Sequence, residues 1–133
     1  MQMRAFAIRE VDLDARRREV RVEGELDLSV ADQLRQRLDA AANDDVDVFV
    51  CLERCDFIDS TGIAAIIFAH KQLASRGRRL LVCGPSRQVS RILTVTGLDH
   101  AGLVYASVEE ALAGGFAASE FVSAGDATAL ARL

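Results

Sequence analysis

The segment Asp59-Ser60-Thr61-Gly62 places one carboxylate and two hydroxyls where a strand-like run meets an apolar helical run. The first turn of a helix leaves backbone N–H groups without intrahelical partners. An Asp or Ser side chain at the N-cap accepts one of their hydrogen bonds and stabilises the helix by roughly 1 kcal/mol. From local chemistry alone, we interpret Asp59 and Ser60 as a helix cap that leaves one hydroxyl, on Ser60, at the helix start.

Nucleophilic catalysis by Ser60 would require an adjacent base. The chain has two histidines, His70 and His100. His70 falls on the side of the predicted helix that faces the sheet, too far along to reach Ser60, and His100 lies in a predicted loop. The sequence also lacks a Gly-x-Ser-x-Gly elbow, a phosphate-binding loop and a paired-carboxylate signature. We therefore predict that the protein is not an enzyme and has no catalytic residues.

Phosphorylation is a third use of Ser60. A phosphoserine at this point would place about two negative charges against the positive end of the helix dipole and the free N–H groups. We expect the fold to tolerate the phosphate. A partner docked on this surface would instead meet its bulk, its charge and its desolvation cost.

The helix after this segment is predicted to have two different faces, since successive residues turn by about 100°. Its sheet-facing side carries Ile63, Ile66, Ile67, Leu73 and Ala74, and its opposite side carries Ala65, Phe68 and Gln72. Phe68 either packs beneath a neighbouring helix or is exposed. If it is exposed, the small residues Gly62, Ala64 and Ala65 would let a partner approach closely.

Composition limits the classes of protein to be considered. The chain has 133 residues, 50% of them apolar, which is enough for one domain with a proper core. A net charge of -4 and a pI near 5.1 argue against a nucleic-acid-binding protein. No stretch approaches the roughly 20 apolar residues that cross a bilayer, and the N-terminus lacks a signal pattern. We expect a cytoplasmic protein that binds neither membrane nor nucleic acid.

Three cysteines, Cys51, Cys55 and Cys83, are present without metal-ligand spacing or an accompanying His cluster. We predict reduced thiols and neither a metal nor a cofactor. Cys51 and Cys83 sit in apolar strand-like runs and are expected to be buried. Cys55, the nearest to Ser60, is expected to be the most exposed, and a thiol-based redox role stays open as an alternative.

Alternating strand and helix patterns predict an α/β domain with a mixed sheet, an N-terminal β-hairpin and about four packed helices. The expected strands cover residues 3–9, 19–25, 46–52, 79–83 and 103–105, with 12–18 as the hairpin connection. The expected helices are one capped by Ser29 and bearing Val30 to Ala41, one over 60–76, one bearing Val89 to Thr96 and ended by Gly97, and one over 107–118. Residues 1–118 would form the domain, and 119–133 a frayed or weakly docked extension.

Three motifs, in order, give the chain a family resemblance: Gly24-Glu25-Leu26-Asp27, then Phe57-Ile58-Asp59-Ser60-Thr61-Gly62, then Pro85 through Arg91 to Thr96-Gly97-Leu98. Together they resemble the bacterial anti-sigma factor antagonists, single-domain proteins of the STAS (sulfate transporter and anti-sigma factor antagonist) superfamily. The resemblance covers about residues 3–118. The combination of motifs is specific, whereas Asp-Ser-Thr-Gly alone would be a weak signal.

The resemblance implies a partner switch. The unphosphorylated protein would bind an anti-sigma factor, itself a serine kinase of the histidine-kinase-like ATPase type, and so free the sigma factor. Phosphorylation at Ser60 would break the complex, and a metal-dependent serine phosphatase would restore it. Asp27 and Asp59 match family acidic residues that position the loop and contact the kinase, and Thr61 is a less accessible second acceptor. The expected partner-binding residues are Asp27, Asp59, Thr61, Gly62, Ala64, Ala65 and Phe68.

Related proteins offer a second function on the same fold. Stressosome scaffolds share it but tend to carry threonine where this chain has Ser60, and the cytoplasmic domains of anion transporters accompany membrane spans that the sequence lacks. The simple antagonist is therefore the preferred interpretation. A stressosome-type scaffold and a thiol-based redox-sensing regulator are the alternatives.

Overall fold

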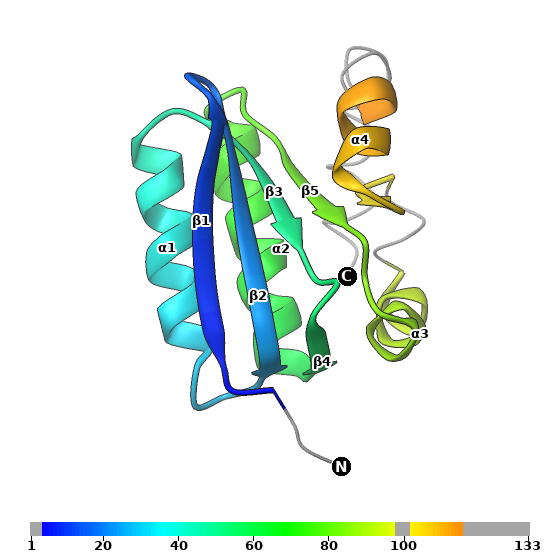
Figure 1. Cartoon of the computed structure of the whole chain (residues 1–133). Coiled ribbons are helices and arrows are strands. Elements are labelled where there is room, and N and C mark those ends of the chain that lie inside the picture. Colours follow the sequence, from blue (N-terminus) through cyan, green and yellow to red (C-terminus); the bar gives the residue numbers. More distant parts are fainter. Residues whose placement is uncertain (1–3, 98–101, 116–133) are drawn as a thin grey trace.

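The computed structural model describes residues 4–97 and 102–115 (Figure 1). A mixed six-stranded sheet runs in the order β1-β2-β3-β5-β6, with β4 paired to β2 beyond the end of β3. The strands are β1 (Ala7–Asp14), β2 (Arg17–Leu26), β3 (Asp47–Cys51), β4 (Cys55–Ile58), β5 (Leu80–Cys83) and β6 (Val104–Tyr105). β1 and β2 are antiparallel and every other pair is parallel. The predicted α/β class and N-terminal hairpin are confirmed.

In the described residues, four helices accompany the sheet: α1 (Ala31–Asn43), α2 (Ser60–Ser75), α3 (Arg87–Thr96) and the short α4 (Val108–Glu110), which continues into a π-helical turn, Ala111–Gly115. α1 and α2 pack together along one face of the sheet, α3 lies against β4, and the π-helical turn after α4 contacts β5 (Figure 1). The predicted helix over 107–118 is thus irregular as far as Gly115, and residues 116–118 lie outside the described part of the chain, as does the 119–133 extension.

The core lies around β3 and the inward face of α2. β3 has four consecutive buried residues, Asp47, Val48, Phe49 and Val50. This is expected of a central strand covered on both faces. Ile66 and Leu73 of α2 are completely buried against this sheet. Such a core fixes the direction of α2, so that its first turn emerges at the edge where β2 and β4 end.

The hairpin differs from its prediction. Residues 12–18 were expected to be a connection, but β1 extends through Asp14 and β2 begins at Arg17. Charged side chains pair across the two strands, with Arg18 Nε 2.8 Å from Asp12 Oδ1. The tight turn is held by a hydrogen bond of 2.8 Å from the Arg16 backbone N–H to Asp14 Oδ1. A polar stretch can therefore form part of two paired strands when side chains of opposite charge face each other across the pair.

The predicted cap of α1 is also wrong. Val30 occupies the N-cap and no side chain caps it. Ser29 instead donates from its backbone N–H and its hydroxyl to Asp27 Oδ1, at 3.0 and 2.6 Å. Because the carboxylate of Asp27 takes both donors of Ser29, the serine belongs to the loop rather than to the helix.

Candidate functional site

Asp59, not Ser60, caps α2. Asp59 Oδ1 accepts hydrogen bonds from the backbone N–H groups of Thr61 and Gly62, at 2.9 and 3.1 Å. It also accepts one from the Thr61 hydroxyl. That hydroxyl and the two N–H groups lower the pKa of the Asp59 carboxyl, which is therefore ionised at neutral pH. The prediction of a cap at this segment is confirmed for Asp59 and wrong for Ser60, which is already the first residue of the helix.

Ser60 is the first residue of α2 and is exposed. Within residues 4–97 and 102–115, no hydrogen bond involves its hydroxyl. Thr61, the other candidate acceptor, is half-buried and its hydroxyl is engaged by Asp59. Of the two hydroxyls in the segment, the one on Ser60 is therefore open to a reagent from solvent.

Asp27 and Asp59 lie at the same sheet edge because β2 and β4 end side by side. Leu26 is in register with Ile58, and the Asp59 N–H donates to the Leu26 carbonyl at 3.1 Å. Asp59 Oδ2 accepts from the backbone N–H of Leu28, at 3.2 Å. Asp59 thus ties the β2–α1 loop to the start of α2, and the Asp27 carboxylate accepts from Ser29 within that loop.

Gly62 is not a surface residue, contrary to its place among the predicted partner contacts. It is buried, and a Cβ there would lie 2.7 Å from Leu26 Cγ and 2.9 Å from Ile58 Cγ1. Any side chain would force α2 away from the ends of β2 and β4. The glycine therefore serves the close approach of the helix to the sheet.

The outer face of α2 divides between exposed and buried residues. Ala64 is exposed and Phe68 is 45% exposed, whereas Ala65 is only 3% exposed because α1 packs beside α2. The prediction that Ala65 contacts a partner therefore has no support in the geometry. The Arg35 guanidinium lies 5.3 Å from the centre of the Phe68 ring, a cation–π contact that steadies the ring without covering it.

Two exposed apolar residues near Ser60 were absent from the predicted contacts. Leu28 is 74% exposed and Phe57 is 38% exposed. Leu28 lies in the β2–α1 loop, where its backbone is tied to Asp59. A leucine between two polar loop residues, Asp27 and Ser29, was a signal in the sequence for this exposure.

His70 lies in the interior, as predicted, and is only 7% exposed. Neither ring nitrogen has a hydrogen-bond partner among the described residues. Burial lowers the pKa of His70, and the nearby charge of Lys71 acts in the same direction. The imidazole is therefore neutral and remote from the Ser60 hydroxyl.

The cysteines correct another prediction. Cys55, expected to be the most exposed, is completely buried, because β4 turns it inward, where its thiol donates to the Phe57 carbonyl at 3.2 Å. Burial raises its pKa to about 11. Cys51 and Cys83 are neighbours in register, and the contact with Cys83 together with burial raises the pKa of Cys51. The thiols of Cys51 and Cys55 are therefore protonated at neutral pH and poorly reactive.

The described ranges, 4–97 and 102–115, contain neither a candidate metal site nor a candidate transmembrane helix. Within these ranges, no group of three or more His, Cys, Asp or Glu side chains is arranged to hold a metal ion. Among the same residues, no helix has the length and hydrophobicity of a transmembrane segment.

Known proteins resemble the chain in sequence and in fold. The STAS domain family model matches residues 10–111. The anti-sigma-B factor antagonist of Staphylococcus aureus (strain NCTC 8325 / PS 47) is 33% identical over 81 residues, which cover 60% of this chain and 75% of that protein. The anti-sigma-B factor antagonist of Bacillus subtilis (strain 168) is 30% identical over 80 residues, covering 60% and 73%.

The fold matches that of the anti-sigma factor antagonist SpoIIAA, a cell fate determinant of Bacillus. Its unphosphorylated form superposes with a TM-score of 0.71 at 25% identity, over 80% of this chain and 93% of SpoIIAA. Its phosphorylated form gives 0.65 at 24% identity, over 80% and 96%. From the family match and these relatives, the chain belongs to the STAS domain family and, within it, to the anti-sigma factor antagonists.

Proposed function

We propose that the chain is a partner-switching regulator controlled by phosphorylation at Ser60. Its unphosphorylated form binds an anti-sigma factor that is a serine kinase of the histidine-kinase-like ATPase type, and so releases the sigma factor. The kinase transfers the γ-phosphoryl group of ATP to Ser60 Oγ, and ADP leaves. The phosphorylated form no longer binds, and a metal-dependent serine phosphatase restores it. The cycle takes place in the cytoplasm.

The observation that carries this proposal is the division of labour within Asp59-Ser60-Thr61-Gly62. Asp59 caps the helix and also occupies the Thr61 hydroxyl. Ser60 is exposed, and its hydroxyl is in no hydrogen bond within the described residues. Modification of Ser60 therefore breaks no contact that holds the fold together.

The surroundings of Ser60 explain how a phosphate would act on a partner rather than on the fold. At the first position of α2 the helix dipole favours negative charge. The ionised carboxylate of Asp59 next to Ser60 repels it, so the phosphate is directed outward. A partner seated on this surface would have to desolvate the phosphate, which costs several kcal/mol unless a cation pairs with it.

Exposed apolar side chains supply the surface for such a partner. Ala64 and Phe68 follow Ser60 at intervals of four residues on α2, and Leu28 is held beside Asp59. The small Ala64 keeps the surface between Ser60 and Phe68 low. We therefore assign the docking surface to Leu28, Ala64 and Phe68 around Ser60, with Asp27 and Asp59 as its acidic contacts.

Incubation of the full chain with its cognate anti-sigma kinase and ATP tests the assignment. We expect the mass to increase by one phosphate, and peptide mapping to find it on Ser60. Ser60→Ala should remain unmodified and still bind the kinase, whereas Ser60→Glu should bind it much more weakly. Ser29→Ala is a matched control, because Ser29 is an exposed serine of the neighbouring loop. Undiminished phosphorylation of Ser60→Ala would refute the site.

A further inference from the structure

Arg35, on the outward face of α1, carries a charge that no carboxylate of the described chain balances. Its side chain is exposed, and its guanidinium lies 5.3 Å from the centre of the Phe68 ring on α2. In residues 4–97 and 102–115 it takes part in no ion pair and donates no hydrogen bond. Its N–H donors, which form a planar fork, are therefore open to an acceptor that a partner supplies.

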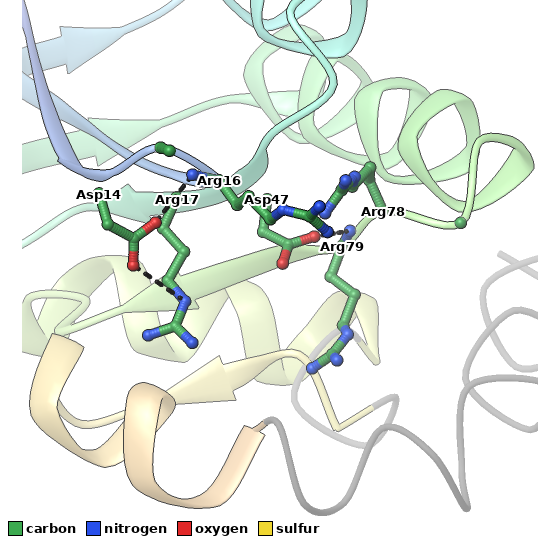
Figure 2. Close-up of a pocket in the computed structure, with 8 residues that line it drawn as sticks. Asp14, Arg16, Arg17, Asp47, Arg78 and Arg79 are labelled. Atoms are coloured by element: carbon green, nitrogen blue, oxygen red, sulfur yellow. Dashed lines mark hydrogen bonds and ion pairs between the residues drawn. The ribbon is translucent and has the colours of Figure 1, made fainter.

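Other arginines of the protein are balanced within the chain. Arg37, two residues further along α1, pairs with Glu10 of β1 at 2.8 Å. Arg17, at the hairpin turn, lies 3.5 Å from Asp14 (Figure 2). The contrast between Arg35 and Arg37 is the more informative one, because the two lie on the same helix and Arg37 is committed to the hairpin.

Two carboxylates on α1 are spaced to pair with Arg35 but do not. Asp32 precedes it by three residues and Asp39 follows it by four, the intervals at which side chains of one helix meet. Among the residues that the structure describes, neither forms an ion pair with Arg35, whose guanidinium lies over the ring of the neighbouring helix instead. Phe68 therefore holds the cation between α1 and α2, away from the carboxylates of its own helix.

The contact between Arg35 and Phe68 lies close enough to Ser60 to belong to the same interface. Phe68 follows Ser60 by eight residues on α2, which is about 12 Å along the helix. Ala64, halfway between them, is exposed and small. One side of an ordinary protein–protein interface covers about 800 Å², a patch roughly 30 Å across. A partner centred on Ser60 therefore also covers Arg35.

The docking surface assigned above carries charges of opposite sign at its two ends. The carboxylates of Asp27 and Asp59 lie in the segments beside Ser60, and the guanidinium of Arg35 lies beside Phe68. Such a surface favours a partner that presents a cation at one end and an anion at the other, and it disfavours the reverse orientation. The charge pattern thus bears on the choice of partner and on its orientation.

We propose that Arg35 binds a carboxylate side chain of the anti-sigma factor and so determines which anti-sigma factor the protein accepts. The planar guanidinium matches the two oxygens of a carboxylate, and such charge-assisted bonds are stronger than neutral ones. Phe68 holds the guanidinium in place before the partner arrives, so less side-chain freedom is lost on binding. This inference rests on the proposed function, because it concerns the same docking surface.

Calorimetric titration of the full chain with its cognate anti-sigma kinase, at low and at moderate salt, tests the assignment. Arg35→Gln should weaken binding at least about tenfold and reduce the dependence of the affinity on salt. Arg35→Lys keeps the charge but loses the fork, so its affinity should fall between those of the parent and Arg35→Gln. Arg35→Glu should bind most weakly of the four, because one carboxylate would then face another.

Arg37→Gln is the matched control, since it removes the same charge from the same helix at a residue that is paired with Glu10. It should bind nearly as the parent does. Thermal unfolding of each variant establishes that it is folded before it is titrated. Phe68→Leu removes the ring, and in that background the further cost of Arg35→Gln should be smaller than in the parent.

Equal affinities of Arg35→Gln and Arg37→Gln would overturn the inference, and so would tighter binding by Arg35→Glu than by Arg35→Gln. If the parent is nonetheless released on phosphorylation of Ser60, the proposed function stands without it. If phosphorylation leaves the affinity unchanged while Arg35→Gln weakens it, the proposed switch fails and the carboxylate contact of Arg35 is supported.

Discussion

The two ends of α2 stand in contrasting surroundings. At its first residue, Ser60, an exposed hydroxyl lies near apolar side chains that reach solvent, Leu28 and Phe68 among them. Just beyond its last residue, polar groups are paired within the chain: Arg76 donates to the Ala42 carbonyl at 2.9 Å, and Arg78 is paired with Asp45.

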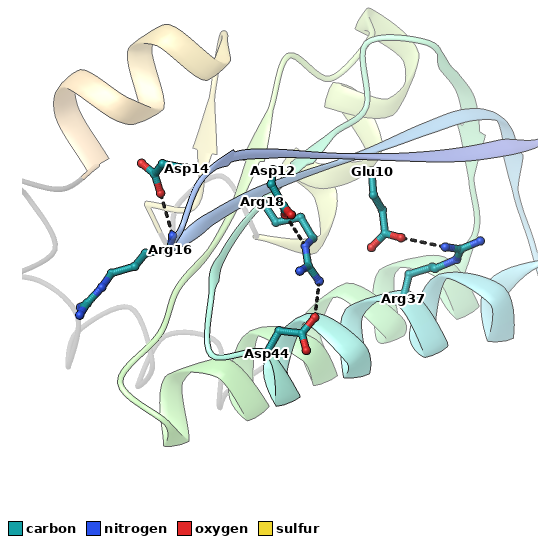
Figure 3. Close-up of polar contacts among 7 residues, drawn as sticks. All are labelled: Glu10, Asp12, Asp14, Arg16, Arg18, Arg37 and Asp44. Carbon is teal, nitrogen blue, oxygen red and sulfur yellow. Dashed lines mark hydrogen bonds and ion pairs between the residues drawn. The ribbon is translucent and has the colours of Figure 1, made fainter.

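The same pairing extends over the hairpin beside the second end (Figure 3). Arg18 bridges Asp12 and Asp44, at 2.8 and 2.9 Å, and Arg37 of α1 reaches Glu10 at 2.8 Å. Exposed pairs of this kind add little stability singly, but they fix the hairpin on α1. Near the C-terminal end of α2 the chain therefore pairs these polar groups within itself, whereas near Ser60 it leaves a hydroxyl and apolar surface for a partner.

The largest expected effect on stability comes from Gly62→Ala, at the Ser60 end. The new Cβ would overlap Leu26 Cγ and Ile58 Cγ1, neither of which can withdraw from the packed strand ends. We expect the free energy of unfolding to fall by about 2 kcal/mol, measured by urea denaturation. An unchanged value would mean that α2 does not approach the sheet as closely as described.

Removal of the α2 cap by Asp59→Ala should have the next largest effect. It deprives the Thr61 and Gly62 N–H groups of their acceptor and releases the Leu28 N–H. We expect a loss of about 1 kcal/mol. Asp32→Ala is the control: Asp32 is an exposed carboxylate in the first turn of α1 that caps nothing, so its removal should cost clearly less. Equal losses would contradict the capping role.

Gly77→Ala tests the opposite end of the helix. Gly77 has a φ of +73°, but a Cβ there would meet nothing within 4 Å. The cost is therefore backbone strain alone, about 1 kcal/mol, and smaller than that of Gly62→Ala. If Gly77→Ala lowers the free energy of unfolding more than Gly62→Ala in matched denaturation curves, the start of α2 is not the more crowded end of the helix.

The smallest expected effect is on the pH dependence of the free energy of unfolding, through His70, which lies midway along α2. Because burial lowers its pKa in the folded state, the unfolded chain takes up the proton first as the pH falls below about 6.5. The free energy of unfolding should therefore decrease from this pH downward, towards the folded-state pKa. His70→Leu should decrease less over the same window in denaturant titrations between pH 8 and 5. Identical pH profiles of the parent and His70→Leu would show that burial does not lower the pKa of His70.

The elements with strong periodicity and clear end signals were predictable from the sequence. α2 begins at Ser60 and α3 is ended by Gly97, at a φ of +82°, both as predicted. The choice between Asp59 and Ser60 as cap was not predictable, since two adjacent residues of suitable type offer the same signal. The point at which β4 ends decides which of the two residues is the cap.

The remaining differences depend on contacts between segments far apart in the sequence. Ala65 is buried because α1 lies against it, and Cys55 because β4 pairs with β2. Asp47 lies between Arg17, its partner in register on β2, and the Arg79 backbone N–H because of the pairing of three strands, which no local pattern encodes. Leu28 is the exception, because its position in a polar loop was a local signal.

The most direct test of the proposed switch is the affinity for the cognate anti-sigma kinase before and after complete phosphorylation at Ser60, measured by calorimetry. We predict that the affinity falls by at least about a hundredfold, because the phosphate must be desolvated within the interface. The thermal stability of the phosphorylated protein itself should stay nearly unchanged. Equal affinities of the two forms would contradict the account, even with the fold and the site of phosphorylation correct.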